Sequence, residues 1–145
     1  MTGVQTCALP IWLTTQQIAD DVGLTLSPCH RRIKLMEQAG IIERYVAIVN
    51  QRAVGLPVSV FISIKLERQK EADLERFAKA ISGWSEVLEC YLMTGHRDYL
   101  LRVVVPDLAA YEQFLKKKLT RVEGVASIES SFALDQLKYS IALPV

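Results

Sequence analysis

The stretch EVLECYLMTGHRDYLLRVVVP, residues 86–106, contains the clearest secondary-structure pattern of the chain. Two runs rich in branched and aromatic residues, 86–94 and 98–106, lie on either side of the short turn GHR. Such runs predict two antiparallel strands joined by a hairpin. Gly95 suits this turn because glycine adopts positive φ angles without a steric cost.

Two interpretations of Asp98 and Tyr99, which begin the second strand, stay open at this point. The carboxylate could meet an ammonium group while the phenol forms the wall of a pocket. The simpler interpretation is a solvated carboxylate and a packed ring, and spacing alone favours it.

Outward from the hairpin, a strand and a helix are predicted on each side. The alternating run 58–66 predicts a strand and the amphipathic run 71–82 a helix. After the hairpin, 107–122 predicts a helix and 125–140 a long strand. The order βαββαβ is that of a ferredoxin-like, antiparallel α+β domain with both helices on one face of the sheet. The other face needs a cover, and self-association is the simplest one.

The residues before this domain have a different pattern. The segments 14–23 and 27–40 predict two short helices, and 41–50 predicts a strand or wing. The connector 51–57 contains a glycine and a proline, so we expect the domain boundary there.

The helix ends carry recognisable capping residues. Thr14 and Gln17 form a capping-box pattern, and Gly23 is a typical helix stop. For the second helix, Ser27 is expected as the N-cap and Pro28 as the first helical residue. Together the two helices form a helix-turn-helix pattern.

The second helix carries positive charge in its first turns. Arg31 and Arg32 suit phosphates or a guanine edge, Lys34 suits a phosphate, and Ser27 and His30 are neighbouring polar groups. A solvated helix face is the ordinary explanation of such charges. Their place in the second helix of a close pair, where a recognition helix meets DNA, favours DNA binding.

Composition excludes several classes of function. The 145 residues contain 17 Lys and Arg against 16 Asp and Glu, three Cys and two His, with a net charge of +1. These numbers give no disulfide framework, no metal-ligand spacing and no polybasic arm, and no metal or other cofactor is expected. No apolar run reaches the roughly 20 residues of a membrane span, and no signal peptide is apparent. A reducing cytoplasm fits this composition.

Candidate catalytic groups are weak. Cys29 and His30 are adjacent on a helix, so their side chains diverge by about 100° and cannot pair as nucleophile and base. Cys90 is expected in the core and His96 at the surface of a turn. The lysines 116–118 are expected on the solvated side of their helix. We therefore do not expect an enzyme.

Four stretches together resemble the Lrp/AsnC (feast/famine) family of bacterial and archaeal transcriptional regulators. They are GLTLSPCHRRIKLMEQAGII (23–42), YVAIVN (45–50), CYLMTGHRDYLLRVVVPDLAAYEQFL (90–115) and EGVASIESSFAL (123–134). The resemblance implies a winged helix-turn-helix that binds double-stranded DNA, followed by a ferredoxin-like domain that pairs sheet to sheet in dimers. The dimers commonly associate into octamers, and an amino acid effector binds at the contacts between them.

The resemblance also implies where the effector binds. Gly95, Asp98 and Tyr99 match the family's effector turn, and His96 occupies a position in it that is often acidic. Ser130 falls where the family often has a threonine near the ligand.

The chain departs from the family's usual residues at two further positions. Ile128 replaces a common hydroxyl residue, which is expected to make the pocket less polar. Leu35 replaces a common basic residue in the recognition helix, so one phosphate contact is expected to be missing.

The N-terminal string MTGVQTCALPI (1–11) has no secondary-structure period and resembles a translated sequencing adaptor. We expect it to be an artefact that stands in place of the family's first helix. The expected domains are then a winged helix-turn-helix lacking its first helix (12–50), the connector (51–57) and the effector and oligomerisation domain (58–145). An alternative function follows: an amino-acid-binding oligomerisation module without effective DNA binding.

Overall fold

The computed structural model describes residues 13–141 and 143–144. The chain divides into two compact units, which are described one at a time. The first ends at Ile48 and takes up the chain again at Leu137, and the second is Val49–Gln136. The segment 1–11, expected to be an artefact, lies outside the described residues.

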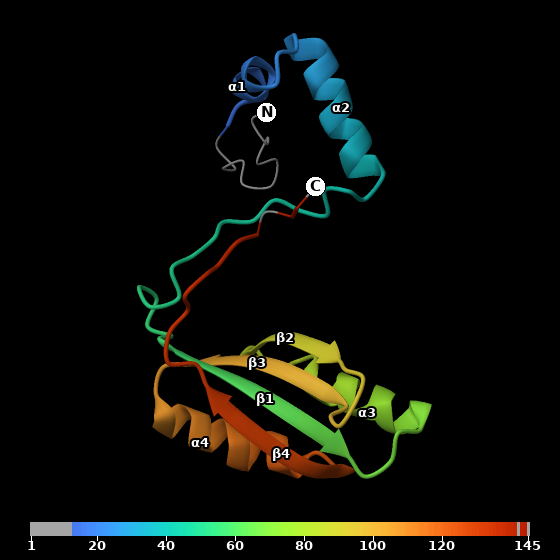
Figure 1. Ribbon diagram of the computed structural model, residues 1–145, viewed down its shortest axis with the longest axis vertical. Coiled ribbons are helices and arrows are strands. Elements are labelled where there is room, and N and C mark those ends of the chain that lie inside the picture. Colours follow the sequence, from blue (N-terminus) through green and yellow to red (C-terminus); the bar gives the residue numbers. More distant parts are fainter. Residues whose placement is uncertain (1–12, 142, 145) are drawn as a thin grey trace. The chain divides into compact units, whose positions relative to one another are not determined.

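The first unit contains the predicted helix pair, α1 (Thr15–Asp21) and α2 (Leu26–Gln38) (Figure 1). The capping box is confirmed. The backbone N–H of Thr14 donates to the Gln17 side chain over 2.8 Å, and the Gln17 backbone N–H donates to Thr14 Oγ1 over 3.2 Å. Gly23 follows α1 with a φ of +67°, which ends the helix as predicted.

The second helix begins two residues earlier than predicted. Its N-cap is Thr25, which has the extended angles φ −79° and ψ 159°, so the prediction of Ser27 as the cap is wrong. Pro28 is then the third helical residue. The first four N–H groups of a helix lack a partner within the helix, so proline fits there as well as at the first position.

Of the strand or wing predicted for 41–50, the strand is wrong: residues 43–50 form neither helix nor strand. A strand needs a partner for its backbone N–H and C=O groups, and no other segment in the described part of this chain pairs with 43–50. Tyr45, Val46 and Ile48 are consequently exposed. The Tyr45 hydroxyl donates to the Glu37 carboxylate over 2.7 Å, which connects this segment to α2.

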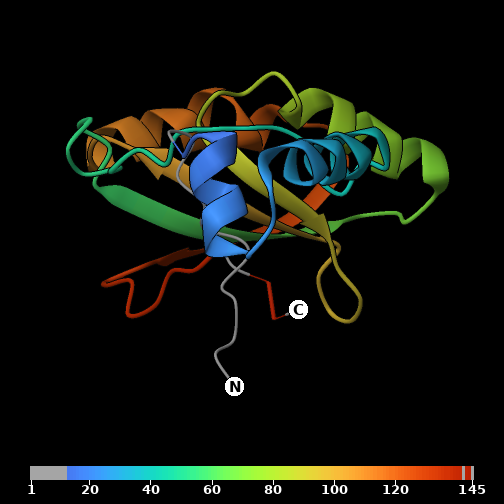
Figure 2. The ribbon, with the colours of Figure 1, turned by 90° about the horizontal axis from the view of Figure 1, so that it is seen from above.

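The second unit confirms the ferredoxin-like α+β fold, with the sheet order β2-β3-β1-β4 and every pair antiparallel (Figure 1). Its elements in chain order are β1 (Val58–Leu66), α3 (Glu71–Ile81), β2 (Val87–Leu92), β3 (Tyr99–Val105), α4 (Leu108–Lys117), a 3₁₀ turn η1 (Leu119–Arg121) and β4 (Val125–Phe132). In Figure 2, α3 and α4 lie along the same side of the sheet.

Two elements are shorter than predicted. The helix predicted for 107–122 ends as α4 at Lys117, and a 3₁₀ turn follows it. The strand predicted to reach residue 140 ends at Phe132. Phe132 pairs with Val60, close to the start of β1, and a final backbone bond joins Ala133 to Ser59, so the partner strand runs out there.

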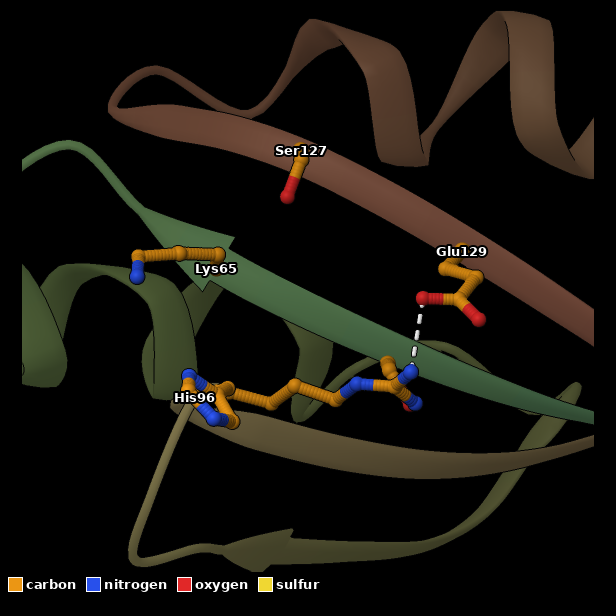
Figure 3. A pocket seen from close by; sticks show the side chains of 6 residues that line it. Lys65, His96, Ser127 and Glu129 are labelled. Atoms are coloured by element: carbon orange, nitrogen blue, oxygen red, sulfur yellow. Dashed lines mark hydrogen bonds and ion pairs between the residues drawn. The ribbon is translucent and has the colours of Figure 1, made fainter.

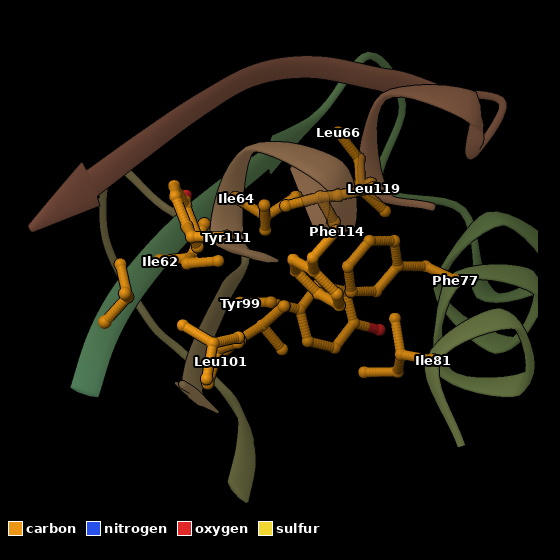
Figure 4. Packing of buried hydrophobic residues seen from close by; sticks show 13 residues of the cluster. Ile62, Ile64, Leu66, Phe77, Ile81, Tyr99, Leu101, Tyr111, Phe114 and Leu119 are labelled. Carbon is orange, nitrogen blue, oxygen red and sulfur yellow. The ribbon is translucent and has the colours of Figure 1, made fainter. Parts of the chain in front are cut away.

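Alternation along the strands places one set of side chains against the two helices. The buried residues of this core are Val60, Ile62, Ile64, Leu66, Phe77, Ile81, Tyr99, Leu101, Val103, Val105, Tyr111, Phe114 and Leu119 (Figure 4). The rings of Phe77 and Tyr99 stack with centroids 4.6 Å apart. These thirteen buried side chains come from five elements, β1, α3, β3, α4 and η1, and give this unit a hydrophobic core of its own.

The opposite face of the sheet carries the alternate side chains, among them Phe61, Ser63 and Lys65 of β1. No helix of this unit covers that face, and Phe61 is 39% exposed. That a second copy of the chain covers this face stays a prediction.

Burial predicts different hydrogen-exchange rates in the two units. Among the described residues of the first unit only Ala19 and Cys29 are buried, whereas the second unit has the thirteen-residue core. We expect amides of α1 and α2 to exchange roughly tenfold or more faster than those of β1 and β3, because local opening costs less where few apolar contacts break. Exchange measured by mass spectrometry tests this, and equal protection in all four elements would contradict it.

Candidate functional site

The first candidate site is the exposed face of α2. Ser27, His30, Arg31 and Lys34 follow one another at intervals of three, one and three residues, which places them on one face of the helix at about 100° per residue. All four are exposed, while Cys29 lies on the opposite face and is buried. The apolar side of α2 therefore packs within the first unit, and its polar side is exposed.

The positive charges on this face have no ion-pair partner among residues 13–141 and 143–144. Among the described residues, none forms a side-chain hydrogen bond or ion pair with His30, Arg31 or Lys34. The first turn of α2 contains no acidic residue. The helix N-terminus adds its own partial positive charge. This face can thus donate hydrogen bonds to phosphates and to the acceptor atoms of guanine.

Two other α2 positions lie off this face. Arg32 is exposed but points about 100° around the helix from Arg31, so it is better placed for a flanking phosphate than for a base edge. Leu35 is 52% exposed. A basic residue at this position would be solvated, whereas leucine exposes apolar surface there.

The second candidate site is a pocket beside the turn between β2 and β3. Its volume is about 350 Å³, and it lies on the open face of the sheet (Figure 3). Gly95 in the turn has a φ of +103°, an angle that other residues rarely adopt, so it fixes the course of the turn. The lining residues are Ser63 and Lys65 from β1, His96 and Arg97 from the turn, and Ser127 and Glu129 from β4.

Arg97 crosses the pocket. One guanidinium nitrogen lies 2.7 Å from a carboxylate oxygen of Glu129, and the other donates to the Ser63 hydroxyl (Figure 3). Strand pairing brings these groups together, because Ser63 lies opposite Glu129 and Lys65 opposite Ser127. The pocket thus combines the cations Lys65 and Arg97 with one carboxylate.

Sequence reasoning missed five of these six residues and found only His96. The alternation of β1 and β4 could have placed Ser63, Lys65, Ser127 and Glu129 on the open face. Their juxtaposition depends on the register between the two strands, which contains an irregularity at Lys65 and Leu66 that no local pattern indicates.

Asp98 and Tyr99, from the expected effector turn, do not line the pocket. Asp98 is only 6% exposed, and its carboxylate accepts hydrogen bonds from the Leu66 backbone (2.7 Å) and the Gln69 side chain (2.6 Å). The Tyr99 hydroxyl donates to the Leu74 carbonyl over 3.0 Å. Burial raises the pKa of Tyr99, which keeps the phenol protonated as this donor. Both residues hold the turn on the core.

Ser130 lies on the helix-covered face of the sheet, away from the pocket, and its hydroxyl is hydrogen-bonded to that of Tyr111 in α4. Ile128 is on the same face and packs against the core, so it does not line this pocket, and its effect on an effector pocket stays a prediction. Of the expected effector residues, only His96 lines the pocket, and Gly95 is its neighbour in the turn.

The described residues also bear on three further features: metal sites, reactive cysteines and membrane-spanning helices. Within 13–141 and 143–144, no group of three or more His, Cys, Asp and Glu could hold a metal ion. Cys29 is buried as a free thiol, whereas Cys90, expected in the core, is exposed near the sheet edge. No helix in the described part of the chain is both long and apolar enough to cross a bilayer.

Comparison with known proteins adds to this geometry. A winged helix-turn-helix DNA-binding family model matches residues 13–43, and the model of the Lrp/AsnC ligand binding domain matches residues 59–143. The chain is 41% identical over 133 residues to the Bkd operon transcriptional regulator of Pseudomonas aeruginosa, covering 92% of this chain and 87% of that protein. It is 36% identical over 133 residues to the DNA-binding transcriptional activator DecR of Escherichia coli, covering 92% and 88%.

Two solved structures are similar along most of the chain. An AsnC family transcriptional regulator from Agrobacterium tumefaciens is 43% identical, with a TM-score of 0.87 and coverage of 92% of this chain and 86% of that one. A transcriptional regulator from Neisseria meningitidis, solved as a complex with L-Met, is 36% identical, with the same TM-score and coverage.

Proposed function

Because the chain belongs to the Lrp/AsnC family of transcriptional regulators, we propose that α2 binds operator DNA and that an amino acid in the turn pocket controls this binding. The observation that carries the DNA half is the face of α2 on which Ser27, His30, Arg31 and Lys34 are exposed and unpaired among the described residues. Arg32 is assigned a flanking phosphate.

The effector half rests on the charges of the pocket. A free amino acid carries a carboxylate and an ammonium group, and the pocket offers Lys65 and Arg97 to the first and Glu129 to the second. Gly95, Asp98 and Tyr99 act indirectly here, since they hold the turn in place. Ser130 contributes only indirectly, through its hydrogen bond to Tyr111 on the helix side of the sheet. The L-Met complex of the Neisseria relative supports an amino acid as the class of ligand.

The proposed assembly is a dimer formed through the open sheet face, with octamers as the further state. Phe61 and the neighbouring polar side chains of that face would then lie between two sheets, which removes exposed apolar surface from water. We place the regulator in the cytoplasm, where DNA and free amino acids are both present. Relatives named as transcriptional regulators support a regulator and not an enzyme.

Titration with a panel of amino acids tests this function. An electrophoretic shift with DNA selected from a random pool, combined with light scattering, measures affinity and assembly in the same samples. We expect at least one amino acid to change operator affinity. A ligand can do so only by binding two states of the regulator with different affinity. No change with any amino acid would contradict the effector half.

Glu129→Gln is predicted to reduce the preference for an amino acid over the corresponding α-keto acid by roughly tenfold. The substitution removes the carboxylate that meets the ammonium group, and it frees Arg97 for the carboxylate that both ligands share. Calorimetric dissociation constants for the two ligands measure the ratio. Glu75→Gln in α3 is the matched control. An unchanged ratio would mean that the ammonium group lies elsewhere.

The alternative, an amino-acid-binding module without effective DNA binding, is favoured by one observation: only two described residues of the first unit are buried. Salt dependence discriminates the two functions. Contacts from Arg31, Arg32 and Lys34 to phosphates release counterions, so affinity for duplex DNA should fall steeply as salt increases. A shallow dependence, or no binding at low salt, would favour the alternative.

A further inference from the structure

A second depression lies on the helix side of the second unit, away from the turn pocket between β2 and β3. Its volume is about 430 Å³. It is lined by Arg76 and Ala80 of α3, Trp84 just after that helix, Lys117 and Lys118 at the end of α4, and Arg121, Val122 and Glu123 beyond them. Four of these eight side chains are cationic and one is anionic.

Two of the cations have carboxylate partners within the chain. Lys118 Nζ lies 2.7 Å from both oxygens of Glu86, and Arg76 lies 3.2 Å from Asp73. Ordinary ion pairs therefore explain why these two positive charges are present.

No carboxylate in the described part of the chain forms an ion pair with the other two cations. Lys117 donates only to the neutral Gln113 side chain, over 3.1 Å, and among the described residues no side chain pairs with that of Arg121. Lys116, on the same helix, is an exposed lysine that does have a carboxylate partner, since it pairs with Glu112 one turn away. The carbonyl end of α4 attracts a cation such as Lys117, but it does not explain Arg121.

Trp84 gives the depression an aromatic wall. Its ring is half-buried and meets Phe114 edge to face, with centroids 5.5 Å apart, so the indole is held in one orientation. No described residue accepts a hydrogen bond from the indole N–H. A rigid aromatic surface beside unpaired cations fits a ligand that has both a flat ring and negative charge.

We propose that this depression binds a free nucleotide, with its phosphates on Lys117 and Arg121 and its base against Trp84. Guanidinium and ammonium groups are the usual partners of phosphate in proteins, and stacking of a base on an aromatic ring tolerates any base. The site is independent of the effector pocket, so it would give the regulator a second small-molecule input. DNA also carries phosphates, and the test therefore separates the two sources.

Fluorescence of Trp84 provides the test. The substitution Trp12→Phe leaves Trp84 as the chain's one tryptophan. We expect ATP to quench its fluorescence saturably with a micromolar dissociation constant. In the same background, Lys117→Gln combined with Arg121→Gln should raise that constant roughly tenfold or more. Lys116→Gln, the matched control on α4, should leave it unchanged.

Each part of the proposal is contradicted by a different result. No saturable quenching by ATP, or equal affinity in the double variant, would overturn the site. Tripolyphosphate binding as tightly as ATP would overturn the role of the base against Trp84. Quenching by a mixed-sequence duplex but not by ATP would assign the depression to the DNA backbone instead. A melting temperature within the error of the parent chain excludes misfolding of the double variant as the cause of weaker binding.

Discussion

We expect a chain in which Arg31 and Lys34 are both replaced by Gln to bind its selected operator roughly 100-fold more weakly at a fixed salt concentration. Both residues lie on the exposed face of α2 without an ion pair among the described residues, so the loss comes from contacts to DNA. Each removed contact to a base edge or phosphate costs about 1–3 kcal/mol. The plot of log affinity against log salt should also become shallower, because fewer counterions are released.

The matched control is the double substitution Arg68→Gln and Lys70→Gln, which removes the same charge from the loop between β1 and α3. It should change operator affinity only slightly. Equal loss in the two double variants would mean that total charge, and not the face of α2, determines binding. Arg32→Gln alone should have a smaller effect than Arg31→Gln, since Arg32 points away from that face.

Asp98→Ala should lower the free energy of unfolding by about 2–4 kcal/mol. The carboxylate of Asp98 accepts two hydrogen bonds, from the Leu66 backbone and the Gln69 side chain, and it is almost completely buried. Its removal leaves the backbone N–H of Leu66 without a partner inside the protein. Asp98→Asn, which keeps one acceptor oxygen, should lose less.

Urea unfolding followed by circular dichroism, at one chain concentration for all variants, measures this free energy. Asp135→Ala is the control, because Asp135 is exposed and accepts only from the adjacent Gln136 backbone. Unchanged stability of Asp98→Ala, together with lost amino acid binding, would contradict the structural role. It would make Asp98 a direct ligand of the effector.

The sequence was most informative where structure depends on neighbouring residues. The capping box of Thr14 and Gln17, the turn at Gly95 and the alternation of β1 are local patterns, and all three are present as predicted. The βαββαβ order follows from such patterns taken together. The cap of α2 was misplaced because Thr25 and Ser27 are both good capping residues, and only backbone angles distinguish them.

What the sequence could not provide were relations between distant strands. Arg97 meets Ser63 and Glu129 only because β1 pairs with both β3 and β4 in one register. The same register places Ser130 on the helix side of the sheet and not in the pocket. The end of β4 at Phe132, and the absence of a strand in 43–50 within the described part of the chain, likewise depend on where partner strands run out.

We propose that an amino acid in the turn pocket controls binding of DNA by α2. The most direct measurement is the operator dissociation constant with and without a saturating amino acid, in the unchanged chain and in Arg97→Gln. We predict that the amino acid changes this constant fivefold or more in the unchanged chain. Arg97→Gln should bind the operator normally when no amino acid is present and lose that response. An operator dissociation constant that responds equally in both chains, or in neither, would contradict the account.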